Sequence, residues 1–314
     1  MLSRAADNLY WMMRYVERAE NIARILSVGH RMSMIGAETG MSQWDAALII
    51  AGCDKPFALR GGPATPRAVI EFLAFEPDNP SSIRACLKYA RENARAMRAQ
   101  ITSEAWEAIN AAWLEMQGFD MAKVEDRGLS IFFDWVRERS HLFRGVAEAT
   151  MQRNDASEFM RLGTLIERAD STARILDVKY HVLLPSPKDV GGAVDYYQWG
   201  ALLRSVSALR IYRQIYRDSI RPLRVAELLI LRDDMPRSLH CCFAEIVQIL
   251  QRLRETYRRD YASVRLAESI LTKLRFGGGV EQVFAVGLHE FLTESIDRNI
   301  ELGAAISEDF MLPA

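Results

Sequence analysis

The sequence has few cysteines and no long apolar run, and each scarcity excludes a class of protein. Its four cysteines show neither metal-ligand spacing nor the density of a disulfide framework, so we expect structural thiols in a reducing compartment. No apolar stretch approaches the roughly 18–20 residues of a membrane helix, and the N-terminus lacks the apolar core of a signal peptide. We therefore expect a cytoplasmic protein with no membrane partner.

Positive charge is neither in excess nor carried by lysine. The net charge is -1, which argues against nucleic acid as a main partner, although it leaves room for a local basic patch. Six of the 40 basic residues are lysine and 34 are arginine. The planar guanidinium suits partly buried pairing with carboxylates, so the bias fits many ion pairs between helices. A GC-rich genome would produce the same bias.

Alternating strand patterns are also scarce, and the sequence predicts an all-α protein. Apolar residues recur at spacings of three and four in windows rich in good helix formers. Loops are expected at 53–66, 185–192 and 277–279. Asn79–Pro80 and Pro236 are expected to open two helices. The predicted helices span 3–33, 42–52, 66–76, 80–100, 103–116, 124–152, 155–183, 195–218, 222–231, 236–260, 262–275 and 281–309.

An internal repeat is the most informative feature of the chain. Three segments correspond in the same order. They are residues 15–28 (YVERAENIARILSV) with 165–178 (LIERADSTARILDV), 43–48 with 198–203, and 69–75 followed by 80–83 with 225–231 followed by 236–239. The offset drifts only from 150 to 155 and 156, as short loop insertions would cause. We therefore expect a duplicated helical bundle whose homologous halves, 1–154 and 155–314, pack about a pseudo-two-fold axis. A boundary is expected near 185–194.

Both copies of the first segment keep a Glu-Arg pair on an amphipathic helix. At 100° per residue the apolar side chains share one arc, whereas Glu17, Glu20 and Arg24 stack on the opposite polar stripe. Arg18 falls at the margin of the apolar arc, and Arg168 does the same in the second copy. Because a buried guanidinium needs a carboxylate or carbonyl partner, we expect a carboxylate from the other half.

This pair has two interpretations. In the structural one, Glu17, Arg18, Glu167 and Arg168 form a network that holds the halves in register. In the functional one, Arg18 and Arg168 grip a carboxylate or phosphate, while Glu17 or Glu167, the candidate catalytic residues, accepts a proton. Further candidates for ligand binding are Glu20, Arg24, Asp170 and Arg174 on the same two helices, and Arg91, Glu92 and Asn93 on the helix at 80–100.

The set at Arg91, Glu92 and Asn93 occurs in one half only. At the offset of 156, its counterparts are the less polar residues Val247, Gln248 and Ile249. Either the first copy has kept a specialised surface, or this helix is solvated in the first half and buried in the second. The sequence is compatible with both.

Signals for a metal or cofactor are weak. Glu138 and His141 have the Glu-x-x-His spacing of di-iron bundles, but the second copy that such sites need is missing. Arginines beside the Glu-Arg carboxylates would repel a hard cation. No glycine-rich phosphate loop follows a strand, and no Gly-x-Ser-x-Gly elbow occurs. We expect no metal and no cofactor.

Several motifs form a specific combination along the whole chain. They are residues 2–12 (LSRAADNLYWM), 15–20 (YVERAE), 79–83 (NPSSI), 90–95 (ARENAR), 166–170 (IERAD), 198–205 (QWGALLRS) and 236–238 (PRS). The combination resembles the bacterial alpha-E family, an all-helical group named for its Glu-Arg motif. Where relatives usually have Gly-Arg-Tyr-Leu-Glu-Arg in the second copy, this chain has Thr164 in place of the first arginine, which puts any role of that arginine in doubt.

The resemblance implies a context rather than a reaction. Genes of this family typically lie beside, or are fused to, a circularly permuted ATP-grasp amidoligase and a transglutaminase-like cysteine peptidase, sometimes with a proteasome-like peptidase. That neighbourhood implies synthesis, attachment or removal of a peptide or amino-acid tag. It leaves open whether this protein is itself an enzyme.

Three functions follow as expectations. The first is a non-catalytic helical partner that binds the ATP-grasp ligase or its peptide product. The second is an enzyme of the same pathway that acts on an amide or amino-acid substrate held by Arg18 and Arg168. The third is a plain homodimeric scaffold that uses exposed aromatic residues.

Overall fold

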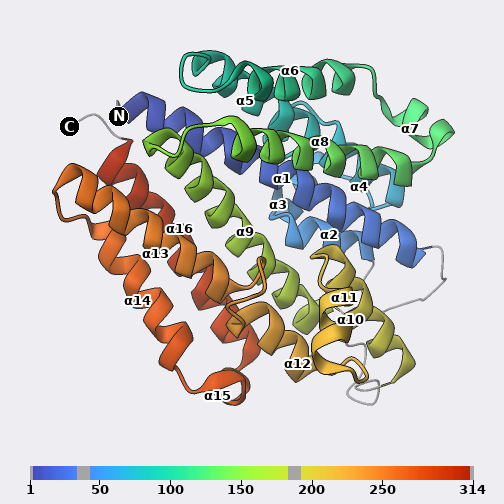
Figure 1. Ribbon diagram of the computed structural model, residues 1–314. Coiled ribbons are helices and arrows are strands. Elements are labelled where there is room, and N and C mark those ends of the chain that lie inside the picture. The colour runs from blue at the N-terminus through green and yellow to red at the C-terminus, as the bar shows by residue number, and fades with distance from the viewer. Residues whose placement is uncertain (1–2, 34–42, 183–191, 312–314) are drawn as a thin grey trace. The chain divides into compact units, whose positions relative to one another are not determined.

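A computed structural model of the protein describes residues 3–33, 43–182 and 192–311. In these ranges the regular elements are sixteen α-helices and one short π-helical segment, without a strand, so the prediction of an all-α protein is confirmed (Figure 1). The described residues form two compact units, one holding 3–33, 43–167 and 310–311 and the other 168–182 and 192–309. The division falls within a helix. Most of the boundary expected near 185–194 lies outside the described residues.

The first unit is built around its long N-terminal helix, α1. This helix packs along α5 and α8, and α6 contacts both of those helices. Leu9, Met12, Val16 and Leu26 are among the buried apolar residues of α1. The helices of the unit are α1 (Ser3–Ser33), α2 (Gln43–Ile50), α3 (Asp54–Arg60), α4 (Pro66–Ala74), α5 (Ile83–Ala96), α6 (Ser103–Gln117), α7 (Met121–Arg127), α8 (Leu129–Thr150) and the first part of α9 (Asp155–Val182).

The second unit contains the rest of α9 and the helices that follow it. Two long helices, α13 and α14, pack along each other, and the short α15 contacts α12, α14 and the π-helical segment. The helices are α10 (Ala193–Ser205), α11 (Leu209–Tyr216), α12 (Pro222–Ala226), the π-helical segment (Glu227–Leu231), α13 (Leu239–Tyr257), α14 (Ala262–Phe276), α15 (Gly279–Val286) and α16 (Leu288–Phe310).

Several predicted helices are interrupted. Those at 124–152 and 281–309 break at Gly128 and Gly287, whose φ angles of 104° and 110° lie in a region that glycine adopts without strain. The helix at 195–218 breaks near Ser207, which also has a positive φ of 57°. The loop predicted at 53–66 contains α3.

The two predicted helix openings, at Asn79–Pro80 and at Pro236, are wrong. Each helix starts at the residue after a serine, Ser82 for α5 and Ser238 for α13. Both serines have extended backbone angles, and each hydroxyl accepts a hydrogen bond from the backbone N–H three residues on, as an N-cap requires. Asn79 turns back instead, and its Nδ2 donates to the carbonyl of Phe72 at 3.1 Å.

The two serine caps share a second contact. The hydroxyl of Ser82 donates to the carbonyl of Glu76 at 2.8 Å, and the hydroxyl of Ser238 donates to the carbonyl of Arg232. In both cases the acceptor lies six residues before the serine. The same local structure therefore occurs at two positions that are 156 residues apart.

Within the first unit, α1 and α9 approach closely at Gly163. A Cβ atom built on Gly163 would lie 2.1 Å from the carbonyl oxygen of Tyr10, which is closer than atoms can approach. Glycine is therefore required for this approach. It brings the following turn of α9, with Glu167, beside α1.

Replacing Gly163 with alanine should reduce stability, because the new methyl group overlaps the backbone of α1. We expect Gly163→Ala to lower the free energy of unfolding by about 1–3 kcal/mol in urea titrations. The matched control is Gly145→Ala on the exposed face of α8, where a Cβ meets no atom within 4 Å. The free energy of unfolding of that variant should rise by up to about 1 kcal/mol, because alanine has a higher helix propensity than glycine. Equal effects of the two substitutions would contradict the close approach.

Candidate functional site

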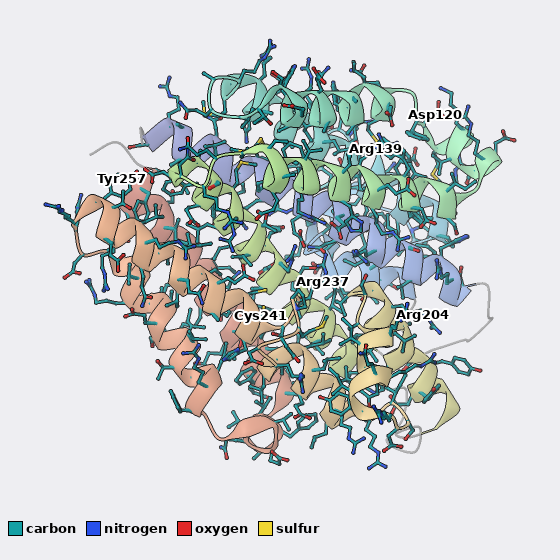
Figure 2. All side chains as sticks on the ribbon, in the orientation of Figure 1. Asp120, Arg139, Arg204, Arg237, Cys241 and Tyr257 are labelled. Carbon is teal, nitrogen blue, oxygen red and sulfur yellow. The ribbon has the colours of Figure 1, made fainter. Side chains whose placement is uncertain are left out.

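Charged side chains and one histidine, from three helices, meet inside the first unit. We call them the Glu-Arg cluster: Arg14, Glu17, Arg18, Glu20 and Arg24 of α1, His141 and Arg144 of α8, and Glu167 of α9. Figure 2 draws the side chains along these helices and labels Arg139, which lies two residues before His141 on α8.

Arg18 and Glu167 form a bidentate ion pair between α1 and α9. Nε of Arg18 donates to Oε1 of Glu167 at 2.6 Å, and Nη2 donates to Oε2 at 2.9 Å. Nε of Arg14 donates to the same Oε2 at 2.9 Å. The Glu167 side chain is only 8% exposed. The expected carboxylate partner of Arg18 is therefore the glutamate of the second Glu-Arg motif.

The two guanidiniums keep Glu167 ionised despite its burial. Burial is the largest single influence on this carboxyl group and would raise its pKa, but the charges and hydrogen bonds of Arg18 and Arg14 outweigh it. The pKa of Glu167 falls from its ordinary value of 4.5 to about 2. A carboxylate with so low a pKa is a weak proton acceptor near neutral pH.

The remaining carboxylates of the cluster are bound by arginines of α1 and α8. Glu17 and Glu20 are 0% exposed. Nη1 of Arg144 donates to Oε2 of Glu17 at 2.6 Å, and its Nη2 donates to Glu20. Nε of Arg24 donates to Oε1 of Glu20 at 2.8 Å. The polar stripe of α1 is therefore inside the helix packing, against α8.

His141 connects the cluster to solvent. Its side chain is 55% exposed, and Nε2 lies 3.3 Å from Oε1 of Glu20 and 3.3 Å from Nη2 of Arg24. The sequence pattern indicates His141 only as a possible metal ligand, and it gives no sign of the role of Arg144. Arg144 follows the buried Phe143, at the edge of the apolar stripe of α8. That position matches the margin at which Arg18 was noticed on α1.

Two aromatic rings lie beside Arg14, and the buried Cys86 thiol interacts electrostatically with Arg18 and Glu167. The Arg14 guanidinium lies 4.5 Å from the ring centroid of Trp11 and 5.6 Å from that of Tyr10, within cation–π range. Burial raises the pKa of the Cys86 thiol to about 12, against the opposing charge of Arg18. A thiol with so high a pKa is a poor nucleophile, which fits the structural role expected for it.

The candidates Arg168, Asp170 and Arg174 belong to the second unit. Nε of Arg174 donates to Oδ2 of Asp170 at 2.7 Å, which is the same four-residue pairing as that of Glu20 with Arg24. Arg168 is half-buried, and its charge opposes the rise in pKa that burial causes at the Cys241 thiol, labelled in Figure 2.

The candidates on α5 make contacts of their own. Nη1 of Arg91 donates to Oε1 of Glu92 at 2.6 Å, and Nε donates to Oδ1 of Asn110 on α6 at 2.9 Å. The Arg91 guanidinium also lies 5.7 Å from the ring centroid of Trp106. Asn93 is half-buried on the same helix. These contacts join α5 to α6.

The described residues contain neither a metal-binding cluster nor a membrane-spanning helix. In residues 3–33, 43–182 and 192–311, no group of three or more His, Cys, Asp and Glu side chains could hold a metal ion. In the same ranges, no helix has the length and apolar character needed to cross a membrane.

The pairing of Glu167 makes stability depend on pH in a defined window. Because its pKa in the folded protein lies below the ordinary value of 4.5, its contribution is complete above about pH 5 and is lost as the pH falls toward 2. The shift corresponds to about 3 kcal/mol. We expect Glu167→Gln to lower the free energy of unfolding by about this amount at pH 7, and by progressively less below about pH 4.5, in urea titrations.

The control is Glu92→Gln, since Glu92 binds Arg91 and Arg95 on a more exposed helix face. This substitution should lower the free energy of unfolding by less than about 1 kcal/mol. A difference between the wild type and Glu167→Gln that does not change with pH would contradict the assigned role of Glu167.

Comparisons with known proteins identify a family. A family model called Alpha-E, described as a predicted alpha-helical domain with a conserved ER motif, matches residues 1–311. No curated protein and no solved structure gives a significant match. Two Glu-Arg pairs of this chain, Glu17–Arg18 and Glu167–Arg168, lie in the repeated segments 15–28 and 165–178. Because the match covers nearly every residue, the chain belongs to the Alpha-E family.

Proposed function

We propose that this protein is a non-catalytic helical partner of an ATP-grasp amidoligase and a transglutaminase-like peptidase. The system would act in the cytoplasm and would make, attach or remove a peptide or amino-acid tag. Family membership supports this context through the gene neighbourhood described above. The observation that carries the non-catalytic assignment is the bidentate binding of Glu167 by Arg18.

The cluster has the properties of a structural network. A guanidinium that already binds a buried carboxylate must exchange that partner before it can bind a substrate anion. Arg18 binds Glu167, and Arg144 binds Glu17 and Glu20. The low pKa of Glu167 also disfavours a role as general base. We therefore assign the Glu-Arg helices to the organisation of the bundle.

We infer further that the chain is an internal duplication with halves at 1–154 and 155–314, related by a pseudo-two-fold axis. Three local features support the duplication because they recur at corresponding positions: the serine caps at Ser82 and Ser238, the four-residue ion pairs Glu20–Arg24 and Asp170–Arg174, and the glycines with positive φ at Gly128 and Gly287. In this account the Glu-Arg helices hold the two halves in register.

An enzyme of the same pathway is the second candidate. It would bind an amide or amino-acid substrate at Arg18 and Arg168 and use Glu17 or Glu167 as the proton acceptor. One observation favours it, since the imidazole of His141 contacts the buried Glu20 and is itself open to solvent. Histidine is the side chain most often used for proton transfer near neutral pH.

The test measures complex formation and turnover on the same preparation. The purified protein is mixed with an ATP-grasp amidoligase and, separately, with a transglutaminase-like peptidase from the same organism. Each mixture is separated by size-exclusion chromatography with light scattering, which also detects a homodimer. We expect a complex of the two proteins in at least one of the mixtures. We expect the isolated protein to leave ATP, amino acids and short peptides unchanged.

Two results would contradict the proposal. One is that the protein forms a complex neither with the ligase nor with the transglutaminase-like peptidase. The other is turnover by the isolated protein that His141→Gln abolishes while the thermal unfolding transition is retained, because this result would establish the enzyme instead.

A further inference from the structure

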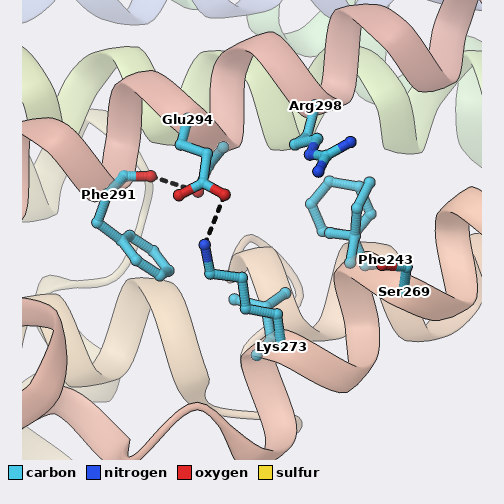
Figure 3. Close-up of a pocket in the computed structure, with 9 residues that line it drawn as sticks. Phe243, Ser269, Lys273, Phe291, Glu294 and Arg298 are labelled. Atoms are coloured by element: carbon cyan, nitrogen blue, oxygen red, sulfur yellow. Dashed lines mark hydrogen bonds and ion pairs between the residues drawn. The ribbon is translucent and has the colours of Figure 1, made fainter.

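A pocket in the second unit has the makings of a ligand site. It lies between α13, α14 and α16 and is open to solvent. The lining residues are Phe243 of α13, Ser269, Ile270, Lys273 and Leu274 of α14, and Phe291, Glu294, Ser295 and Arg298 of α16 (Figure 3).

The pocket combines an apolar floor with charged groups at its mouth. Phe243 and Leu274 are buried, and Ile270 and Phe291 are half-buried. In Figure 3 the ammonium group of Lys273 is directed at the carboxylate of Glu294, with the ring of Phe291 beside them. An apolar surface with a few polar groups that fix orientation is the usual composition of a ligand site.

The ion pair at the mouth of the pocket can give up one of its partners to a ligand. Nζ of Lys273 donates to Oε1 of Glu294 at 2.6 Å, but the two side chains are 53% and 48% exposed. Arg298 is equally exposed, and its Nη1 donates to Oε2 of Glu301, outside the pocket, at 3.0 Å. Because exposed ion pairs contribute little stability, an incoming carboxylate can replace Glu294 on Lys273 at low cost.

We propose that this pocket binds a carboxylate that bears an apolar side chain, such as the C-terminal residue of a peptide or a free amino acid. The carboxylate binds Lys273 and Arg298, and the side chain lies on Ile270 and Phe291. Glu294 occupies the place of the ligand carboxylate in the unliganded protein. The inference rests on the proposed function only for the biological source of the ligand. The pocket belongs to the second unit, whereas the Glu-Arg cluster belongs to the first.

The experiment is a methyl NMR titration of the full chain, read at Ile270 and Leu274. The probes are N-acetylphenylalanine, phenylalanine and phenylalaninamide. We expect saturable shifts with one or both of the first two, with a dissociation constant on the order of 1 mM for ligands of this size. Phenylalaninamide, which lacks the carboxylate, should bind at least about tenfold more weakly. Binding of N-acetylphenylalanine indicates peptide C-termini, and binding of phenylalanine alone indicates free amino acids.

Substitutions of the charged groups test the contacts. Lys273→Met and Arg298→Met should each weaken binding about tenfold, whereas Arg265→Met, an exposed residue earlier on α14, should not change it. Glu294→Gln should strengthen binding of N-acetylphenylalanine severalfold, because it removes the competing carboxylate.

Three results would overturn the proposal: no saturable shift with either carboxylate, equal binding of the amide, or unchanged binding in Lys273→Met and Arg298→Met. The titration needs no partner protein. A failure here therefore leaves the test of complex formation intact, and a failure of complex formation leaves this test intact.

Discussion

The packing of the first unit depends on the charged side chains that α1 buries. A buried carboxylate or guanidinium is costly unless opposite charge and hydrogen bonds replace its water. Glu167 meets this requirement with Arg18, and Glu17 and Glu20 meet it with Arg144. Such pairs act only at short range and in defined directions, so they fix how α8 and the first part of α9 lie along α1 more strictly than apolar contacts do. The absence of a side chain at Gly163 allows α9 to lie this close to α1.

The Glu-Arg cluster and the pocket of the second unit contrast in how their charges are held. In the Glu-Arg cluster, carboxylates with little or no exposure bind arginines from neighbouring helices, and the pKa of Glu167 is far below its usual range. Such groups resist exchange and suit a structural role. In the second unit, Lys273 and Glu294 are half exposed at the mouth of an apolar pocket. A ligand can reach and replace that pair, which is why we place ligand binding there.

The sequence predicts what a helix encodes within itself and misses what depends on contacts between helices. The first helix was predicted at 3–33 and is found at Ser3–Ser33, because its apolar periodicity is unbroken. The breaks at Gly128 and Gly287 were missed, since an isolated glycine in a periodic pattern does not reveal its φ angle. The sequence predicted a carboxylate partner for Arg18, because this guanidinium lies at the margin of the apolar arc of its helix. The role of Arg144 was missed because no pattern within α8 tells which face of α1 it meets.

A double-mutant cycle between Arg18 and Glu167 tests the central claim most directly. The free energies of unfolding of the wild type, Arg18→Met, Glu167→Gln and the double variant are compared at pH 7. If the pair organises the bundle, the two single effects overlap, and the coupling energy is at least about 1 kcal/mol. Additive effects, with a coupling energy near zero, would show that the two side chains do not stabilise each other and would contradict the account.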